Sequence, residues 1–251
     1  MITIKSEKEI ELMRHAGHLV SEMHKFIKPY IKEGITTKEL DKLCEDFIRS
    51  QDAVPTEKGY EGYPASICAS VNDTVVHGIP NNYKLKNGDI ITIDTVIGYK
   101  GYQGDSAWTY KVGEINEDDE YLMKHTEKAL YKGINEVKPG ARIGDVSAAV
   151  EKYAKEHNLG VVRELCGHGI GSEMHEDPEV PNYGLPNTGP KLKPGMVICI
   201  EPMLTFGKRY IYQEDDGWTI KTEDGKNAAH YEHTVLVTEN GYEILTPRLD
   251  D

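Results

Sequence analysis

The sequence predicts a mixed α/β (α+β) fold built from two related halves, and three observations lead to that prediction. Helical stripes with recognisable N-terminal caps alternate along the chain with short β-like runs. Two pairs of segments recur at nearly the same spacing, which indicates an internal duplication. The length of 251 residues lies near the upper limit for one hydrophobic core, so we expect one domain over 1–251.

Two helices are expected in the first part of the chain, and each follows a capping-box pattern. Ser6-x-x-Glu9 precedes apolar or small residues at helical spacing, and Thr36-x-x-Glu39 precedes a second stripe of this kind. A third helix is expected over about 145–157. These helices are separated by charged or glycine-bearing segments from the β-like runs.

The duplication predicts two halves, roughly 1–110 and 111–251. The recurring segments are 31–34 (IKEG) with 137–140 (VKPG), and 84–94 (KLKNGDIITID) with 191–201 (KLKPGMVICIE). Both β-runs of the second pair end in a carboxylate, so the duplication would place Asp94 and Glu201 at equivalent positions near a shared axis. The alternative is a coincidence between two similar turn-and-strand segments.

Composition excludes several classes of protein. The net charge of −13 argues against a protein that binds nucleic acid through a basic surface. No apolar run approaches the roughly 20 residues that span a bilayer, and charged residues follow Met1 so soon that we expect no signal peptide. The cysteines form no CxxC pair, which is typical of reduced thiols in a cytoplasmic protein. They are Cys44, Cys68, Cys166 and Cys199.

An acidic hairpin is expected where DIITIDTVIG is followed by YQGDSAWTY. A two-residue turn at Tyr99 and Lys100 would place Asp94 directly opposite Asp105, with Cβ atoms about 4.5–5.5 Å apart. Two unit charges at ~4 Å cost roughly 4 kcal/mol at an effective dielectric of 20, so such a pair needs a proton or a cation between its members. Taken alone, the hairpin could also be a solvated face with two harmless acids.

Further polar residues of the kind that bind metals stand beside β-like runs or glycines. Glu232 precedes the run 234–237, His168 lies among glycines, and His77 and His175 stand near glycines or prolines. Each histidine alone would more often be a structural residue. The phosphate-loop, HExxH and GxSxG motifs are absent from the sequence.

Taken in order, five of these residues resemble the ligand signature of the pita-bread metallopeptidases. They are Asp94, Asp105, His168, Glu201 and Glu232. The strings around them make the chain similar to the type I methionine aminopeptidases over essentially its whole length. The strings are Asn72-x4-His77-Gly-Ile-Pro, Gly-Asp105, Gly-His168-Gly-Ile-Gly, Ile-Glu201-Pro and Tyr231-Glu232-His233-Thr. The resemblance implies a pita-bread fold, with two pseudo-symmetric halves and a curved antiparallel sheet covered by helices.

The resemblance also implies a site for two divalent metal ions, with Co, Mn, Fe or Zn as candidates. It assigns Asp94 to one ion, His168 and Glu201 to the other, and Asp105 and Glu232 to both. A metal-bridged hydroxide would attack the scissile carbonyl.

The catalytic residues implied by the resemblance are Glu201 as proton shuttle, His175 as the group that stabilises the oxyanion, and His77 at the leaving amine. A pocket for the methionine side chain would be lined by Tyr60, Tyr63, Cys68, Met174 and Trp218. Met174 stands where relatives often carry an aromatic residue.

The implied function is removal of the initiator methionine when the second residue is small. Expected substrates are N-terminal methionyl peptides and nascent polypeptides; docking on the ribosome is left open, a monomer is the default, and the cytoplasm is the expected compartment. An Xaa-Pro aminopeptidase of the same fold is the alternative, although such relatives carry a further domain ahead of the catalytic pattern, which here begins with the first helix. Type II methionine aminopeptidases insert a helical subdomain between the last two acidic ligands, so the gap of only 31 residues between Glu201 and Glu232 favours type I. The five intact ligands argue against a non-catalytic binding protein of this fold.

Overall fold

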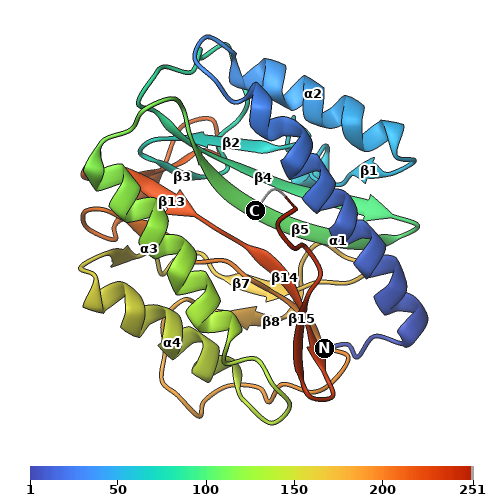
Figure 1. Cartoon of the computed structure of the whole chain (residues 1–251). Coiled ribbons are helices and arrows are strands. Elements are labelled where there is room, and N and C mark those ends of the chain that lie inside the picture. Colours follow the sequence, from blue (N-terminus) through green and yellow to red (C-terminus); the bar gives the residue numbers. More distant parts are fainter. Residues whose placement is uncertain (250–251) are drawn as a thin grey trace.

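The computed structural model of the chain describes residues 1–249, in which four α-helices surround a set of short strands (Figure 1). The helices are α1 (Glu7–Ile27), α2 (Thr37–Ser50), α3 (Glu117–Ile134) and α4 (Ile143–Glu156), with 3-10 turns at Lys28–Tyr30 and Tyr60–Gly62. In Figure 1, α1 crosses β4 and β5 and α2 lies beside α1 near β1, while α3 and α4 cover the other half of the molecule. None of these helices combines the length and the apolar character that a membrane span requires.

The strands form antiparallel sheets whose members come from both halves of the chain. They are β1 (Val54–Pro55), β2 (Cys68–Val71), β3 (Thr74–Val76), β4 (Ile90–Tyr99), β5 (Tyr102–Lys111), β6 (Gly160–Val161), β7 (Gly167–Gly169), β8 (Glu176–Val180), β9 (Val197–Ile200), β10 (Met203–Thr205), β11 (Ile211–Gln213), β12 (Ile220–Thr222), β13 (Ala228–His230), β14 (His233–Thr238) and β15 (Gly241–Ile244). One sheet joins β1, β4, β2 and β5, and the largest runs in the order β15-β14-β9-β7-β8. The order β11-β12-β3 links strands that are far apart in the sequence.

The two capping boxes expected from the sequence are confirmed. Ser6 caps α1 with Glu9, and Thr36 caps α2 with Glu39, each through reciprocal side-chain and backbone hydrogen bonds. The third expected helix corresponds to α4, which begins two residues earlier than predicted. The sequence analysis did not define α3, whose N-cap is Asn116.

The predicted duplication is visible as equivalent hydrogen bonds in the two halves. Gly34 N donates to Leu85 O at 2.8 Å, and Gly140 N donates to Leu192 O at 3.0 Å. An isolated β-bridge follows each of these bonds, Thr36 with Lys84 and Arg142 with Lys191. The helix pair α1–α2 with the strands β4–β5 therefore corresponds to the pair α3–α4 with the strands β9–β14. This is the pseudo-symmetric arrangement of the pita-bread fold.

The two halves meet along β5, which runs beside β13 and β14. Glu232 N donates to Ala107 O at 2.9 Å, and Asp105 N donates to Thr234 Oγ1 at 3.0 Å. Further along, His230 N donates to Thr109 Oγ1 at 3.0 Å. Hydroxyl groups thus replace part of a backbone ladder at this seam, and they fix Asp105 and Glu232 close to each other.

The hairpin register predicted from the sequence is wrong by two residues. Tyr99 pairs with Tyr102, so the turn residues are Lys100 (φ 47°) and Gly101 (φ 86°) rather than Tyr99 and Lys100. A tight hairpin turn of this kind needs positive φ at both central residues, which glycine adopts most easily. Asp94 consequently pairs with Ala107, and Asp105 pairs with Val96. The two aspartates are diagonal neighbours, still on one face of the sheet because the shift is even.

Helix α1 approaches β5 so closely that Gly104 on the strand packs against the helix backbone at Gly17. A Cβ atom at Gly104 would lie 2.7 Å from the backbone nitrogen of Gly17 and 2.8 Å from the carbonyl carbon of Ala16. Backbone atoms of a helix cannot move aside as a flexible side chain can. The absence of a side chain at Gly104 therefore sets the distance between α1 and the sheet.

We predict that Gly104→Ala lowers the free energy of unfolding by about 1–3 kcal/mol, since overpacking forces the helix away from the sheet. The matched control is Gly241→Ala, where an added Cβ meets no atom within 4 Å and φ is not positive. Urea denaturation of both variants measures the difference. Equal midpoints for the two variants would show that α1 is not held at this contact.

Candidate metal centre and active site

The β4–β5 hairpin presents its acidic residues on the face opposite its apolar contacts. Along β4, Ile91 and Ile93 belong to the main hydrophobic core, whereas Asp94 and Val96 line a cavity. This alternation follows from the two-residue period of a strand. Asp105 pairs with Val96 and reaches the same cavity.

The second half brings a histidine and two glutamates to this point. His168 on β7 places Nε2 at 3.4 Å from Glu201 Oε1 and 3.5 Å from Asp105 Oδ2. Its Nδ1 lies 2.8 Å from Gly169 O, a bond that leaves Nε2 free to face the carboxylates. Glu201 directly follows β9 and Glu232 directly precedes β14, so the pairing of these strands brings the two glutamates together.

Burial and mutual repulsion dominate the electrostatics of this cluster. Burial, followed by the charges of Asp105 and Glu201, raises the pKa values of Asp94 and Glu232 well above their usual range. Burial also opposes ionisation of Glu201, but the hydrogen bond with His230 and the charges of nearby histidines lower its pKa overall. For His168, burial acts against protonation, yet the contacts with Asp105 and Glu201 raise its pKa to about 9.

The donor atoms of the cluster fit divalent cations. Three buried oxygens have no hydrogen-bond partner: Asp94 Oδ1, Asp105 Oδ1 and Glu232 Oε1. Buried polar atoms are nearly always paired, so three such oxygens in one place fit a bound cation. Donor atoms of Asp105, His168 and Glu232 lie within 4.8 Å of one another, and carboxylate with imidazole is a donor set that suits Mn, Fe, Co or Zn.

Two further histidines border the cluster. The ring of His175 lies 4.3 Å from that of His168, between centroids, and Tyr60 Oη lies 3.1 Å from His175 Nδ1. His77 follows β3 with φ 58°, a left-handed conformation that turns the chain at this point. Burial lowers the pKa of both His77 and His175, which favours neutral imidazoles able to donate or accept a proton.

All twelve residues proposed from the sequence line one cavity of about 240 Å³. They are His77, His175, Asp94, Asp105, His168, Glu201, Glu232, Tyr60, Tyr63, Cys68, Met174 and Trp218. Tyr63 and Trp218 meet edge to face with ring centroids 5.0 Å apart, and Cys68 packs in the same cluster. A larger, open hollow of about 510 Å³ beside β2 and β12 is lined by none of the twelve.

Two polar residues of this region were missed by the sequence analysis. His230 Nε2 lies 3.1 Å from Glu201 Oε2, and its position in the sequence two residues before Glu232 was a usable signal. Glu57 is 8% exposed, lines the cavity, and lies 3.7 Å from Cys68 Sγ. Burial and then the charge of Asp94 raise the pKa of Glu57 well above its usual value. No sequence pattern indicated Glu57.

Comparison with known proteins agrees with this geometry. Residues 11–239 match the model of metallopeptidase family M24. The chain is 52% identical to methionine aminopeptidase 1 of Bacillus subtilis, over 98% of this chain and 99% of that protein. It is 46% identical to the methionine aminopeptidase of Escherichia coli K12, over 100% of this chain and 96% of that protein.

Solved structures extend the comparison to the fold. The methionine aminopeptidase of Rickettsia prowazekii superposes with a TM-score of 0.97 at 44% identity, covering 98% of this chain and 100% of that chain. A prolidase of Pyrococcus horikoshii superposes with a TM-score of 0.80 at 24% identity, covering 97% of this chain and 63% of that one, and shows a shared fold alone. The chain therefore belongs to metallopeptidase family M24 and, within it, to the type I methionine aminopeptidases.

Proposed function

We propose that this chain removes the N-terminal methionine from peptides and nascent proteins by hydrolysis, preferentially when the second residue is small. The observation that carries the proposal is the position of three unpartnered carboxylate oxygens beside a cavity walled by aromatic and sulfur-bearing side chains. Its relatives of 46–52% identity are named methionine aminopeptidases. We place the activity in the cytoplasm, where nascent chains emerge, and propose a monomer; docking on the ribosome is a further part of the proposal.

The proposed metal centre holds two divalent ions. Asp94 would bind one ion, His168 and Glu201 the other, and Asp105 and Glu232 both. Four carboxylates carry four negative charges, which two divalent cations would neutralise. Ions held there supply Lewis-acid chemistry, since they lower the pKa of water and polarise a carbonyl oxygen. Cobalt, manganese, iron and zinc all fit this donor set.

The protein's own side chains supply proton transfer and orientation. Glu201 is proposed to take the proton of the attacking water, and its hydrogen bond with His230 fixes the direction of the carboxylate. With Tyr60 donating to Nδ1 of His175, Nε2 carries the proton and can donate to the developing oxyanion. His77, which lines the same cavity, is proposed to contact the scissile amide and to help protonate the leaving amine.

The proposed specificity pocket suits an unbranched thioether. Tyr63 and Cys68 are buried at 3% and 5% exposure, and Met174 is 5% exposed, so an entering side chain would exchange water for aromatic and sulfur contacts. Such contacts favour the polarisable sulfur of methionine. Trp218 closes the pocket against both Tyr63 and His77.

We expect the protein, reconstituted with Mn, Co, Fe or Zn, to release methionine from Met-Ala-Ser and to release nothing from Ala-Met-Ser. Chromatography of the released amino acid measures the reaction. Release of the first residue from Xaa-Pro peptides instead would keep the metal centre but would assign the alternative aminopeptidase activity. Absence of release with every metal, in protein shown to contain ions, would contradict the proposed function.

Removal of metal should lower the melting temperature, because a ligand that binds only the folded state stabilises it by about 2.7 kcal/mol at a hundredfold excess over Kd. Calorimetry of chelator-treated and metal-loaded samples, with metal content measured for each, tests this expectation. Coincident melting curves for samples of different metal content would be incompatible with a cation site among buried carboxylates.

Asp105→Asn should abolish activity and weaken metal binding, since an amide cannot supply the charge of a bridging carboxylate. The fold should persist, because Asp105 is held through its backbone by Thr234. In the presence of chelator the variant should melt no lower than the wild type, as one repelling charge is gone. The matched control is Asp46→Asn on the exposed face of α2, which should change neither property. Near-normal turnover of Asp105→Asn would remove this residue from the metal centre.

A further inference from the structure

The loop between β7 and β8 carries both Met174 and His175, and it is held from outside the active site. On one side, the beginning of β5 supports the loop: Gln103 N donates to Gly171 O at 2.9 Å, and Gln103 Nε2 donates to Ser172 O at 3.2 Å. These bonds fix the first half of the loop. The second half, which contains His175, depends on the residue that follows it.

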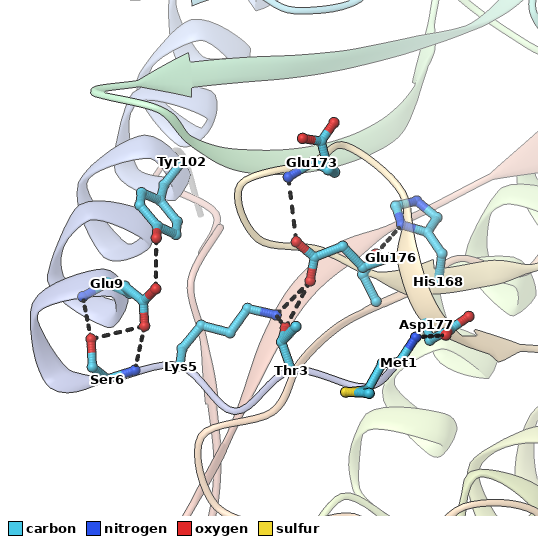
Figure 2. A network of polar contacts seen from close by, with 11 residues as sticks. Met1, Thr3, Lys5, Ser6, Glu9, Tyr102, His168, Glu173, Glu176 and Asp177 are labelled. Carbon is cyan, nitrogen blue, oxygen red and sulfur yellow. Dashed lines mark hydrogen bonds and ion pairs between the residues drawn. The ribbon is translucent and has the colours of Figure 1, made fainter.

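That residue is Glu176, whose carboxylate is bound by the N-terminal segment of the chain (Figure 2). Glu176 Oε2 accepts hydrogen bonds from Lys5 Nζ at 2.8 Å and from Thr3 Oγ1 at 2.9 Å. Lys5 Nζ also donates to Thr3 Oγ1. On the loop itself, Glu173 N donates to Glu176 Oε1 at 3.3 Å.

The Lys5–Glu176 ion pair is buried and packs directly on the loop backbone. The side chain of Lys5 is 4% exposed and that of Glu176 is 12% exposed. A Cβ at Gly171 would lie 2.5 Å from Glu176 Oε1 and 2.7 Å from Lys5 Cε, so the pair packs directly against this glycine of the loop. Burial alone would raise the pKa of Glu176, but the hydrogen bonds from Lys5 and Thr3 lower it overall.

Lys5 is itself fixed to the second half of the molecule. Lys5 N donates to Gly195 O at 2.9 Å, and Gly195 N donates to Val237 O on β14 at 2.9 Å. Strand β14 is thereby connected, through Gly195 and Lys5, to Glu176 at the end of the β7–β8 loop. This chain of hydrogen bonds links β14, which follows the candidate ligand Glu232, to the loop that carries His175.

We propose that Lys5 is a positioning residue: through its buried ion pair with Glu176 it holds the loop 170–176, and with it His175 and Met174, against the metal centre. The catalytic consequence rests on the function proposed above for His175. The bond between Tyr60 and His175 does not replace this support, because it is an exposed contact between two side chains and holds neither end of the loop backbone.

The first test is Lys5→Met, which keeps an unbranched side chain one atom shorter and removes its charge. We expect kcat for Met-Ala-Ser to fall about 10- to 100-fold at saturating metal, the range for loss of groups that orient a site from outside it. Metal content should equal that of the wild type. Amide hydrogen exchange at 171–176 should become faster, and this measurement does not depend on activity.

The control is Arg14→Met, which breaks an exposed ion pair between α1 and β15, Arg14 with Glu243. It should change neither kcat nor exchange in the loop. A second variant, Lys5→Met with Glu176→Met, removes both charges and leaves no unpaired buried ion. We expect it to recover the melting temperature lost in Lys5→Met but not kcat, since the bonds that aim the loop are still absent.

Faster exchange in the loop together with lower kcat, in Lys5→Met but not in Arg14→Met, supports the positioning role. A lower melting temperature with unchanged kcat and unchanged exchange overturns it, as does recovery of both kcat and melting temperature in the double variant. If Lys5→Met does not fold, the double variant decides by the same two measurements. Should the wild type release methionine from no peptide, the proposed function fails, while loop exchange still decides whether Lys5 holds the loop.

Discussion

The structure depends on the burial of four carboxylates where its two halves meet. Asp94 and Asp105 come from one half and Glu201 and Glu232 from the other, and water is largely excluded from them. Such an arrangement is unfavourable unless positive charge is added, yet the surrounding hydrogen bonds keep the acids in place. The hydroxyl of Thr234 holds Asp105, and Ser106 Oγ donates to Glu232 O at 2.6 Å. The fold therefore stabilises a site that is electrostatically strained by itself.

The rest of the architecture follows from this requirement. Helices cover the apolar face of the β4–β5 hairpin, so that its polar face is free to form the cavity. Cavity walls come from segments that the duplication does not relate, such as the turn at Tyr60 and the residue Trp218 near β12. Symmetry thus brings the acids together, and the asymmetric loops add the histidines and the pocket. A shared fold with prolidases is compatible with different substrates for this reason.

Much of the fold could be predicted from the sequence because the signals were local or repeated. Ser6 with Glu9 and Thr36 with Glu39 mark helix starts within four residues, and the recurrence of 84–94 at 191–201 marks the duplication. The helix after Asn116 was missed because its cap lacks the Ser/Thr and Glu/Gln pattern. The twelve residues proposed for the site line one cavity, and they were selected through the resemblance carried by ordered motifs rather than through local patterns.

Other features could not be read from the sequence because they depend on distant contacts. Lys5 and Glu176 are 171 residues apart, and nothing near either residue indicates the partner. Glu57 is polar and would ordinarily be placed on the surface, yet the fold buries it beside Cys68. The predicted hairpin register was wrong for a local reason. The choice between two adjacent two-residue turns depends on which residues accept positive φ, and here these are Lys100 and Gly101.

The two-residue turn at Lys100 and Gly101 also limits which changes in chain length the β4–β5 hairpin can accept. Side chains alternate between faces, so inserting or deleting a single residue between Tyr99 and Tyr102 without a compensating bulge would exchange the inward and outward faces of β5 relative to β4. Asp105 would then point toward α1, and Gly104 would no longer lie beneath it. A change of two residues preserves the faces. Lengths of this hairpin among functional descendants of the chain should therefore differ in steps of two, whereas exposed loops elsewhere can vary by any number.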